Sequence, residues 1–218
     1  MEVKVNLKIF IFILLFYLTG QLEIYGLLMA FAFLHELGHF MMGIILKFKP
    51  KALRIMPFGL TISFSVFPKD YNRKVKNANQ LTIKKMIIAI AGPITNLFLI
   101  LFLLFQKETF LGINRNMMIY ANFLIAIFNL IPIYPLDGGR IIKYIISLQK
   151  GREKANYFSN EIANITIILL TMLSSIAILF YHNIAIILVL GYLWFLVILQ
   201  NKRYREKRKL YRLIKNNT

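Results

Sequence analysis

The sequence predicts an all-α polytopic membrane protein, with about six transmembrane helices and a short β-hairpin or re-entrant segment between the second and third. Hydrophobic residues make up 58% of the 218 positions, and the mean hydropathy of +0.64 is too high for a soluble globular domain of this size. Several stretches lack formal charge for about twenty residues, the length that a helix needs to cross a bilayer. Because the chain has no Cys, disulfides, thiol nucleophiles and cysteine-ligated metals are excluded.

The apolar stretches account for the six helices. Those that we expect to form single spans are Ile9–Leu22, Ile24–Leu46, Met86–Phe105 and Met117–Leu136. The first could also be the core of a signal peptide, but no small-residue cleavage site follows it, so we favour a span. The last stretch, Ile162–Leu199, is about twice as long as one span needs. It is therefore expected to fold back as two helices that meet at His182-Asn183.

Basic residues orient these spans. If both termini are cytoplasmic, all of the 27 Lys and Arg residues except Lys107 and Arg115 fall on the inner side. The net charge of +18 then reflects retention of these segments beside an anionic membrane surface. We expect a multi-pass protein of a bacterial cytoplasmic membrane, with one membrane domain over residues 1–200 and a basic cytoplasmic tail over 201–218. Direct binding of nucleic acid is not expected.

One segment between the second and third spans has the pattern of a β-strand. Thr61–Phe67 alternates polar and apolar residues and is bounded by Pro57-Phe58-Gly59 and by Pro68. The segment is either a loop that lies on the lipid surface without a special role or an edge strand that pairs with an extended partner chain.

Ionisable residues inside the second span need an explanation, because charged groups are costly in hydrocarbon. The span contains His35-Glu36-Leu37-Gly38-His39, an H-E-x-x-H sequence. Residues four apart lie on one face of a helix, so both imidazoles can bind the same ion. Glu36 lies beside the open coordination position, where it can accept a proton from a water that zinc has acidified. A pair of structural histidines is the alternative.

Two imidazoles and a water leave a tetrahedral zinc one ligand short. The other acidic residues, apart from Glu36, fall in loops, caps or tails, which leaves Asp137 at the cytoplasmic end of the fourth span. Two prolines and two glycines between Pro132 and Gly139 interrupt the helix there. Non-helical backbone at membrane depth is tolerated where it lines a cavity or is buried in protein. Both the second and the fourth span run from outside to inside, so Asp137 and the histidines are expected at compatible depths.

Three motifs in this order resemble the site-2 protease family of intramembrane zinc metalloproteases. They are the membrane-embedded H-E-L-G-H, the segment Ala91-Gly92-Pro93-Ile94-Thr95-Asn96, and Asn129-x-x-Pro-x-x-Pro-Leu-Asp-Gly-Gly. The resemblance covers roughly residues 9–200. It implies Zn²⁺ bound by His35, His39 and Asp137, with Glu36 as general base, and it implies that Asn129 contacts the substrate.

Within the family the chain is most similar to the sporulation branch, whose members process a membrane-associated pro-sigma factor. The resemblance therefore implies a membrane-associated protein substrate and membrane-protein regulators. Relatives in that branch usually carry a C-terminal nucleotide-binding domain, whereas here a basic segment of eighteen residues follows the last span, so the resemblance does not extend to ATP sensing of that kind. No PDZ domain is inserted, which disfavours the envelope-stress branch.

The expected activity is that of a zinc metalloendopeptidase. Asn129 or Asn96 could donate an amide hydrogen to the developing oxyanion, although an interhelical hydrogen bond is the more ordinary role for each. A serine protease is disfavoured because no G-x-S-x-G occurs, and an aspartyl protease because Asp137 has no second membrane aspartate. A metal transporter that uses the same ligands would not need Glu36, and a protease-like scaffold would function fully with Glu36→Gln.

Overall fold

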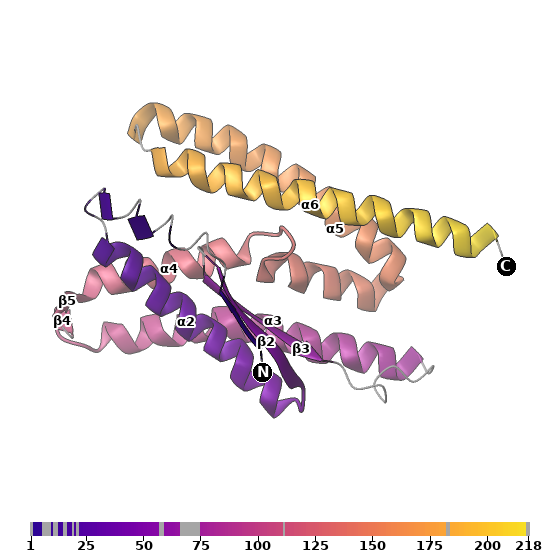
Figure 1. Ribbon diagram of the computed structural model, residues 1–218, viewed down its shortest axis with the longest axis horizontal. Coiled ribbons are helices and arrows are strands. Elements are labelled where there is room, and N and C mark those ends of the chain that lie inside the picture. Colours follow the sequence, from indigo (N-terminus) through magenta and orange to yellow (C-terminus); the bar gives the residue numbers. More distant parts are fainter. Residues whose placement is uncertain are drawn as a thin grey trace. The chain divides into compact units, whose positions relative to one another are not determined.

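The computed structural model describes residues 2–5, 10, 13–14, 17–18, 20, 22–56, 59–65, 75–110, 112–181 and 184–216. The chain forms two compact units, Met1–Asn129 and Leu130–Thr218. The first contains the shorter elements and the second contains the two long helices α5 and α6 (Figure 1).

The elements follow one another along the chain in a simple order. In the first unit they are β1 (Glu2–Val5), α2 (Leu22–Ile45), β2 (Lys49–Met56), β3 (Gly59–Ser65), α3 (Val75–Leu104), β4 (Thr109–Phe110), β5 (Ile113–Asn114) and α4 (Arg115–Leu130). In the second unit they are α5 (Asp137–Tyr181) and α6 (Ile184–Asn216).

Within the described residues, four helices are long and apolar enough to cross a membrane. They are Leu22–Ile45, Asn79–Leu104, Asp137–Phe180 and Ile186–Lys209. The prediction of a mostly helical membrane protein is thus supported, whereas the count of six spans stays a prediction. Half of the residues of the expected first span, Ile9–Leu22, lie outside the described residues, as does the turn at His182-Asn183.

The expected fourth span, Met117–Leu136, is only partly helical. Helix α4 has 16 residues and ends at Leu130, which is about 24 Å of helix and short of a full span. Turns and bends fill positions 131–136, where Pro132 and Pro135 each remove a backbone N–H that a helix would use. The two prolines thus convert the end of the apolar stretch into the loop that precedes Asp137.

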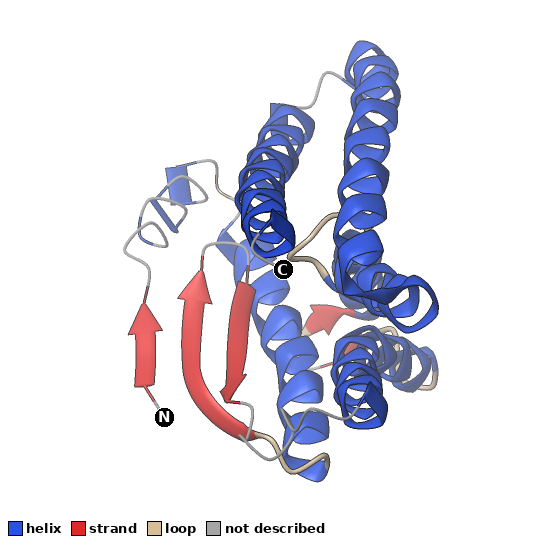
Figure 2. Ribbon diagram, turned by 90° about the vertical axis from the view of Figure 1, so that its right-hand side faces the viewer, coloured by secondary structure: helices blue, strands red, loops and turns tan. Residues whose placement is uncertain are grey.

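A three-stranded sheet combines β1, which precedes α2 in the sequence, with β2 and β3, which lie between α2 and α3. β2 pairs antiparallel with β3, and β1 pairs parallel with the other edge of β2, in the order β1-β2-β3. Figure 2 shows the three strands side by side, with the N-terminal strand outermost. The strand expected at Thr61–Phe67 corresponds to β3, which begins earlier, at Gly59, and is described as far as Ser65. Its re-entry into the membrane stays a prediction.

The end of α2 directs the chain into this sheet. Lys47 adopts a left-handed conformation with φ of 64°. The N–H of Lys47 donates to the carbonyl of Ile44 at 2.8 Å, and that of Phe48 donates to Gly43 at 2.9 Å. This pair of bonds is the Schellman motif that terminates many helices. Phe64 of β3 then packs against Gly43, where no larger residue would fit.

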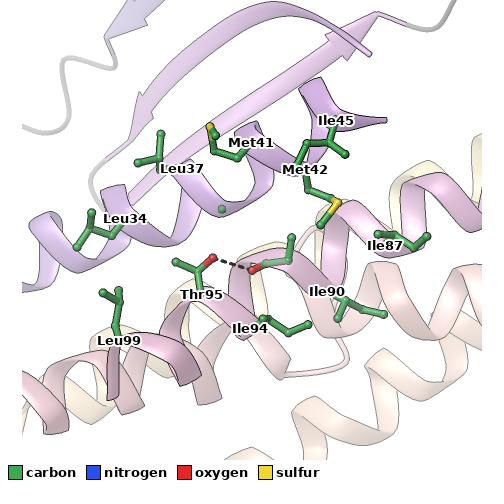
Figure 3. Close-up of a pocket in the computed structure, with 12 residues that line it drawn as sticks. Leu34, Leu37, Met41, Met42, Ile45, Ile87, Ile90, Ile94, Thr95 and Leu99 are labelled. Carbon is green, nitrogen blue, oxygen red and sulfur yellow. Dashed lines mark hydrogen bonds between the residues drawn. The ribbon is translucent and has the colours of Figure 1, made fainter. Parts of the chain in front are cut away.

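Helices α2 and α3 approach each other closely through glycine. A Cβ at Gly38 would collide with the side chain of Thr95 on α3. Small residues at such crossings allow backbones to approach within membranes. Beside this contact lies a groove of about 410 Å³ whose apolar lining includes Leu37, Met41 and Ile94 (Figure 3). The Thr95 hydroxyl in it donates to the carbonyl of Ala91 at 2.9 Å.

The second unit is a pair of long helices with a break in the first. Gly151 has φ of 83° and ψ of 167°, so α5 is divided into segments 137–150 and 152–181. Gln200 of α6 ties this unit together. Its side-chain oxygen accepts the N–H of Tyr134 at 2.9 Å, and its amide nitrogen donates to the carbonyl of Ser159 at 2.9 Å. Helix α6 continues through the basic tail to Asn216.

Candidate metal centre

The two histidines of the H-E-x-x-H sequence meet on one face of α2. His35 and His39 are 2% and 3% exposed, and their rings stand nearly perpendicular, at 88°. The Nε2 atoms of the two rings lie 3.2 Å apart. The helical spacing of four residues is the cause of this convergence, because it places the second ring one turn above the first. The two imidazoles therefore lie side by side on one face of α2, and that they bind one ion stays a prediction.

A hydrogen bond fixes the orientation of the His39 ring. Nδ1 of His39 lies 2.7 Å from the carbonyl oxygen of Ile88 on α3. A carbonyl can only accept, so Nδ1 carries the proton and Nε2 of the neutral ring presents its lone pair. Metal-binding histidines typically donate their second ring N–H in this way.

Gly92 of α3 provides the space in which the ring nitrogens meet. A Cβ at this position would lie 2.6 Å from Nε2 of His35 and 2.5 Å from Nε2 of His39. Only glycine therefore leaves room beside the pair. The sequence places Gly92 in an apolar span directly before a proline, but gives no sign that it faces the histidines. The sequence analysis named Gly92 within a family motif but did not predict that it lies beside the two histidines.

The distance between the ring nitrogens matches a tetrahedral metal. Two nitrogen ligands of Zn²⁺, each about 2.0–2.1 Å from the ion, are about 3.3–3.4 Å apart at the tetrahedral angle. The observed separation of 3.2 Å between the Nε2 atoms is close to that value. His35 and His39 thus fit two of the ligands that zinc requires.

Glu36 follows His35 on α2 and is half-buried. Its side chain leaves the helix about 100° around the axis from His35, so it lies beside the imidazole face without being one of the stacked pair. That placement is the one expected of a base next to a two-histidine metal site. The role of Glu36 as general base stays a prediction.

Asp137 belongs to the second unit, where it is the first residue of α5 and is 3% exposed. Its Oδ1 lies 3.6 Å from Nη1 of Arg140, and the N-terminus of α5 adds partial positive charge. Both stabilise a charged carboxylate. Gly138 and Gly139 let the start of α5 press against the backbone of Leu130 and Ile133, where a Cβ would collide. That Asp137 completes the metal site stays a prediction.

The two candidate asparagines have different surroundings. Nδ2 of Asn129 donates to the carbonyl of Ile125 within α4 at 3.0 Å, which leaves one amide hydrogen for another acceptor. Asn96 on α3 is fully buried, and neither polar atom of its side chain has a hydrogen-bonding partner among the described residues. Its backbone carbonyl accepts from Nδ2 of Asn122 on α4 at 3.0 Å. Asn122 was not predicted, although a polar residue in an apolar helix is a recognisable signal.

Comparison with known proteins finds sequences similar to this chain. The family described as Peptidase family M50 matches residues 111–173. Stage IV sporulation protein FB of Bacillus subtilis is 27% identical over 141 residues, which is 64% of this chain and 46% of that protein. Zinc metalloprotease MJ0392 of Methanocaldococcus jannaschii is 27% identical over 174 residues, 78% of this chain and 46% of that protein. The chain spans about half the length of these curated relatives.

A solved structure shares the fold. The site-2 protease from Methanocaldococcus jannaschii superimposes with a TM-score of 0.64 at 24% identity, covering 91% of this chain and 89% of that one. The four apolar helices and these membrane relatives identify the chain as an integral membrane protein. Together with the three sequence motifs, these matches show that the chain is similar to members of the site-2 protease family, and that its residues 111–173 match peptidase family M50.

Proposed function

We propose that this protein is an intramembrane zinc metalloendopeptidase that cleaves a membrane-associated protein. The observation that carries the proposal is the buried pair His35 and His39, whose Nε2 atoms are 3.2 Å apart beside Gly92. A structural role requires neither this spacing nor the adjacent Glu36, and a transporter that used the same ligands would not require Glu36. The relative from Methanocaldococcus jannaschii, named a zinc metalloprotease, supports the choice of metal and reaction.

The proposed roles follow from the donor atoms. His35 and His39 would bind the metal through Nε2, and Asp137 would supply the third ligand through its carboxylate. When bound, Zn²⁺ supplies a Lewis acid that acidifies water and polarises the scissile carbonyl. Glu36 takes the proton from the attacking water and delivers it to the leaving amine. The amide of Asn96 or Asn129 would donate a hydrogen bond to the oxyanion.

The substrate must be extended where it is cut, since a helical peptide bond is shielded. β3 is an edge strand of the sheet, and we propose that the substrate pairs with this edge. A sporulation pro-sigma factor is the first substrate to test, because stage IV sporulation protein FB is among the relatives. The proposed setting is a bacterial cytoplasmic membrane with both termini in the cytoplasm, as the distribution of basic residues indicates.

Co-expression with a membrane-tethered pro-protein tests the reaction and separates the roles. Glu36→Gln should lower the rate of cleavage at least a hundredfold, while the purified chain keeps its metal. Asp137→Asn should abolish cleavage and also lower the metal content, because it replaces a charged ligand with a neutral amide. Cleavage products are followed by immunoblot and metal by elemental analysis. Normal cleavage by Glu36→Gln would contradict the proposal, and zinc uptake into vesicles by the same variant would favour a transporter.

A further inference from the structure

The second unit contains a cluster of positive side chains that the proposed proteolysis does not use. A pocket of about 90 Å³ lies between α5 and α6, and its polar lining includes Lys143, Arg203 and Lys207. A wider pocket of about 350 Å³ shares Lys207 with the first and adds Lys154 and Arg208. We refer to the two together as the cationic pocket.

These cations converge on one pocket, and the orientation of the chain in the membrane does not require that convergence. The side chain of Lys143 contacts that of Lys207 and is within electrostatic reach of Arg203. Among the described residues, Glu153 is the one carboxylate that lines either part of the pocket. Retention of a segment in the cytoplasm depends on how many basic residues it carries, not on their convergence. Like charges that are held together repel unless an anion joins them.

The surrounding framework holds the cluster in place. The ring of Tyr134 lies 5.3 Å from Nζ of Lys143 and 5.9 Å from the guanidinium carbon of Arg203, which are cation–π distances. Gln200, also in the lining, is fixed by its bonds to Tyr134 and Ser159. Oδ1 of Asn160 is buried there without a hydrogen-bonding partner among the described residues. An amide that is turned over could present its NH₂ group to a ligand in the pocket.

We propose that the cationic pocket binds a phosphate group, carried either by the headgroup of an anionic phospholipid or by a soluble phosphate compound. The guanidinium of Arg203 matches phosphate oxygens in a bidentate manner, and the two ammonium groups add point charges. Arg203 and Lys207 follow the apolar part of α6, where a helix that crosses the membrane is expected to reach the lipid headgroups. This assignment does not depend on the proposed proteolysis.

The test measures lipid binding to the full chain in detergent micelles by native mass spectrometry. Dioleoyl phosphatidylglycerol should bind the wild type more tightly than zwitterionic dioleoyl phosphatidylcholine. R203Q/K207Q should weaken the first affinity at least tenfold, because it removes charge-assisted hydrogen bonds to the phosphate that each contribute about tenfold or more. The control K202Q/R205Q removes the same charge from α6 at positions that do not line the pocket. It should change the affinity less than about twofold, and equal losses in the two double variants would overturn the proposal.

A second variant controls for the possibility that R203Q/K207Q binds weakly because it misfolds. Asn160→Asp is nearly isosteric and places a negative charge in the pocket, so it should weaken phosphatidylglycerol binding at least fivefold. Unchanged affinity would overturn the proposal.

Competition with inorganic phosphate distinguishes a lipid headgroup from a soluble phosphate compound as the ligand. Displacement of the lipid by millimolar phosphate supports a soluble ligand, and retention of the lipid supports a headgroup. Failure of both probes to bind the wild type more tightly than R203Q/K207Q would also overturn the proposal.

Discussion

At the scale of single residues, neighbouring groups of the protein already orient the rings of His35 and His39 for binding. The hydrogen bond from His39 Nδ1 to the carbonyl of Ile88 sets the ring orientation, and Gly92 leaves the space in front of both Nε2 atoms. Helix α3 thus contributes no ligand of its own to the pair, yet it determines whether the pair can bind an ion.

The substitution Gly92→Ala tests this residue-level argument. The added Cβ would occupy the space where the nitrogens converge, so bound metal should fall at least tenfold, within the range seen when groups behind metal ligands are changed. The helix itself should tolerate alanine better than glycine. Elemental analysis of the purified chain gives the metal per protein. Gly26→Ala on α2 is the control, because its new Cβ would meet nothing within 4 Å.

The sequence could predict the histidine pair but not its neighbour. A spacing of four residues inside an apolar span predicts which side chains share a helix face. This local rule was sufficient to predict that His35 and His39 lie side by side. Which residue of α3 faces them depends on how two helices pack, and an apolar sequence such as that around Gly92 allows several registers. Residues missed by sequence reasoning, such as Asn122, act through contacts between helices in the same way.

At the scale of elements, the sheet shows what hydropathy can and cannot predict. The alternation around Thr61 was enough to predict a strand. β1 was not predicted, although Glu2-Val3-Lys4-Val5 also alternates, because four residues are a weak signal. Its parallel pairing with β2 joins segments separated by the whole of α2, which no local pattern specifies.

Two neighbouring prolines can test whether the free edge of β3 binds substrate. Successive N–H groups along a strand point in opposite directions, so of Thr61→Pro and Ile62→Pro one removes a donor facing β2 and the other removes a donor facing the open edge. If the edge holds substrate, both variants should slow cleavage at least tenfold while keeping normal metal content. Unchanged cleavage in the variant that alters the open edge would contradict substrate pairing there.

The contact of Gln200 with the loop before α5 gives another element-level prediction. Gln200→Leu leaves the N–H of Tyr134 and the carbonyl of Ser159 without this partner, and each lost buried bond costs about 1–3 kcal/mol. Hydrogen exchange of residues 131–136 should accelerate, and the unfolding temperature should fall. Gln149→Leu, at an exposed position of α5, should leave both measurements unchanged. An exchange rate unaffected by Gln200→Leu would show that the loop is held by other contacts.

At the scale of the whole molecule, the apolar stretches predicted the class of protein and most helices. They do not show where α4 stops, which the prolines and glycines between Pro132 and Gly139 did predict, or where α5 bends. α4 stops because Pro132 and Pro135 follow it, and α5 bends at Gly151, whose positive φ a glycine adopts without strain. A count of spans from hydropathy alone treats every apolar stretch as one straight helix, so it does not detect breaks that single proline or glycine residues cause.

The orientation of the chain can be measured directly because it contains no Cys. Single cysteines can be introduced without background labelling. In intact cells, Glu108→Cys, between α3 and α4, should react with a membrane-impermeant maleimide. Glu153→Cys, in the basic segment of α5, should react only after the cells are opened, because its surroundings are expected in the cytoplasm. The reverse pattern would show that the positive-inside argument assigns the wrong orientation.

The side-chain amide of Gln200 in α6 stabilises a segment that lies far from it in the sequence. Gln200 supports the turn that presents Asp137, and it does so from the last helix, more than sixty positions later in the sequence. The final helix is therefore part of the scaffold of the acidic residue as well as a membrane anchor. A truncated protein lacking that helix would keep every residue of the three family motifs and still lose the brace behind one of them.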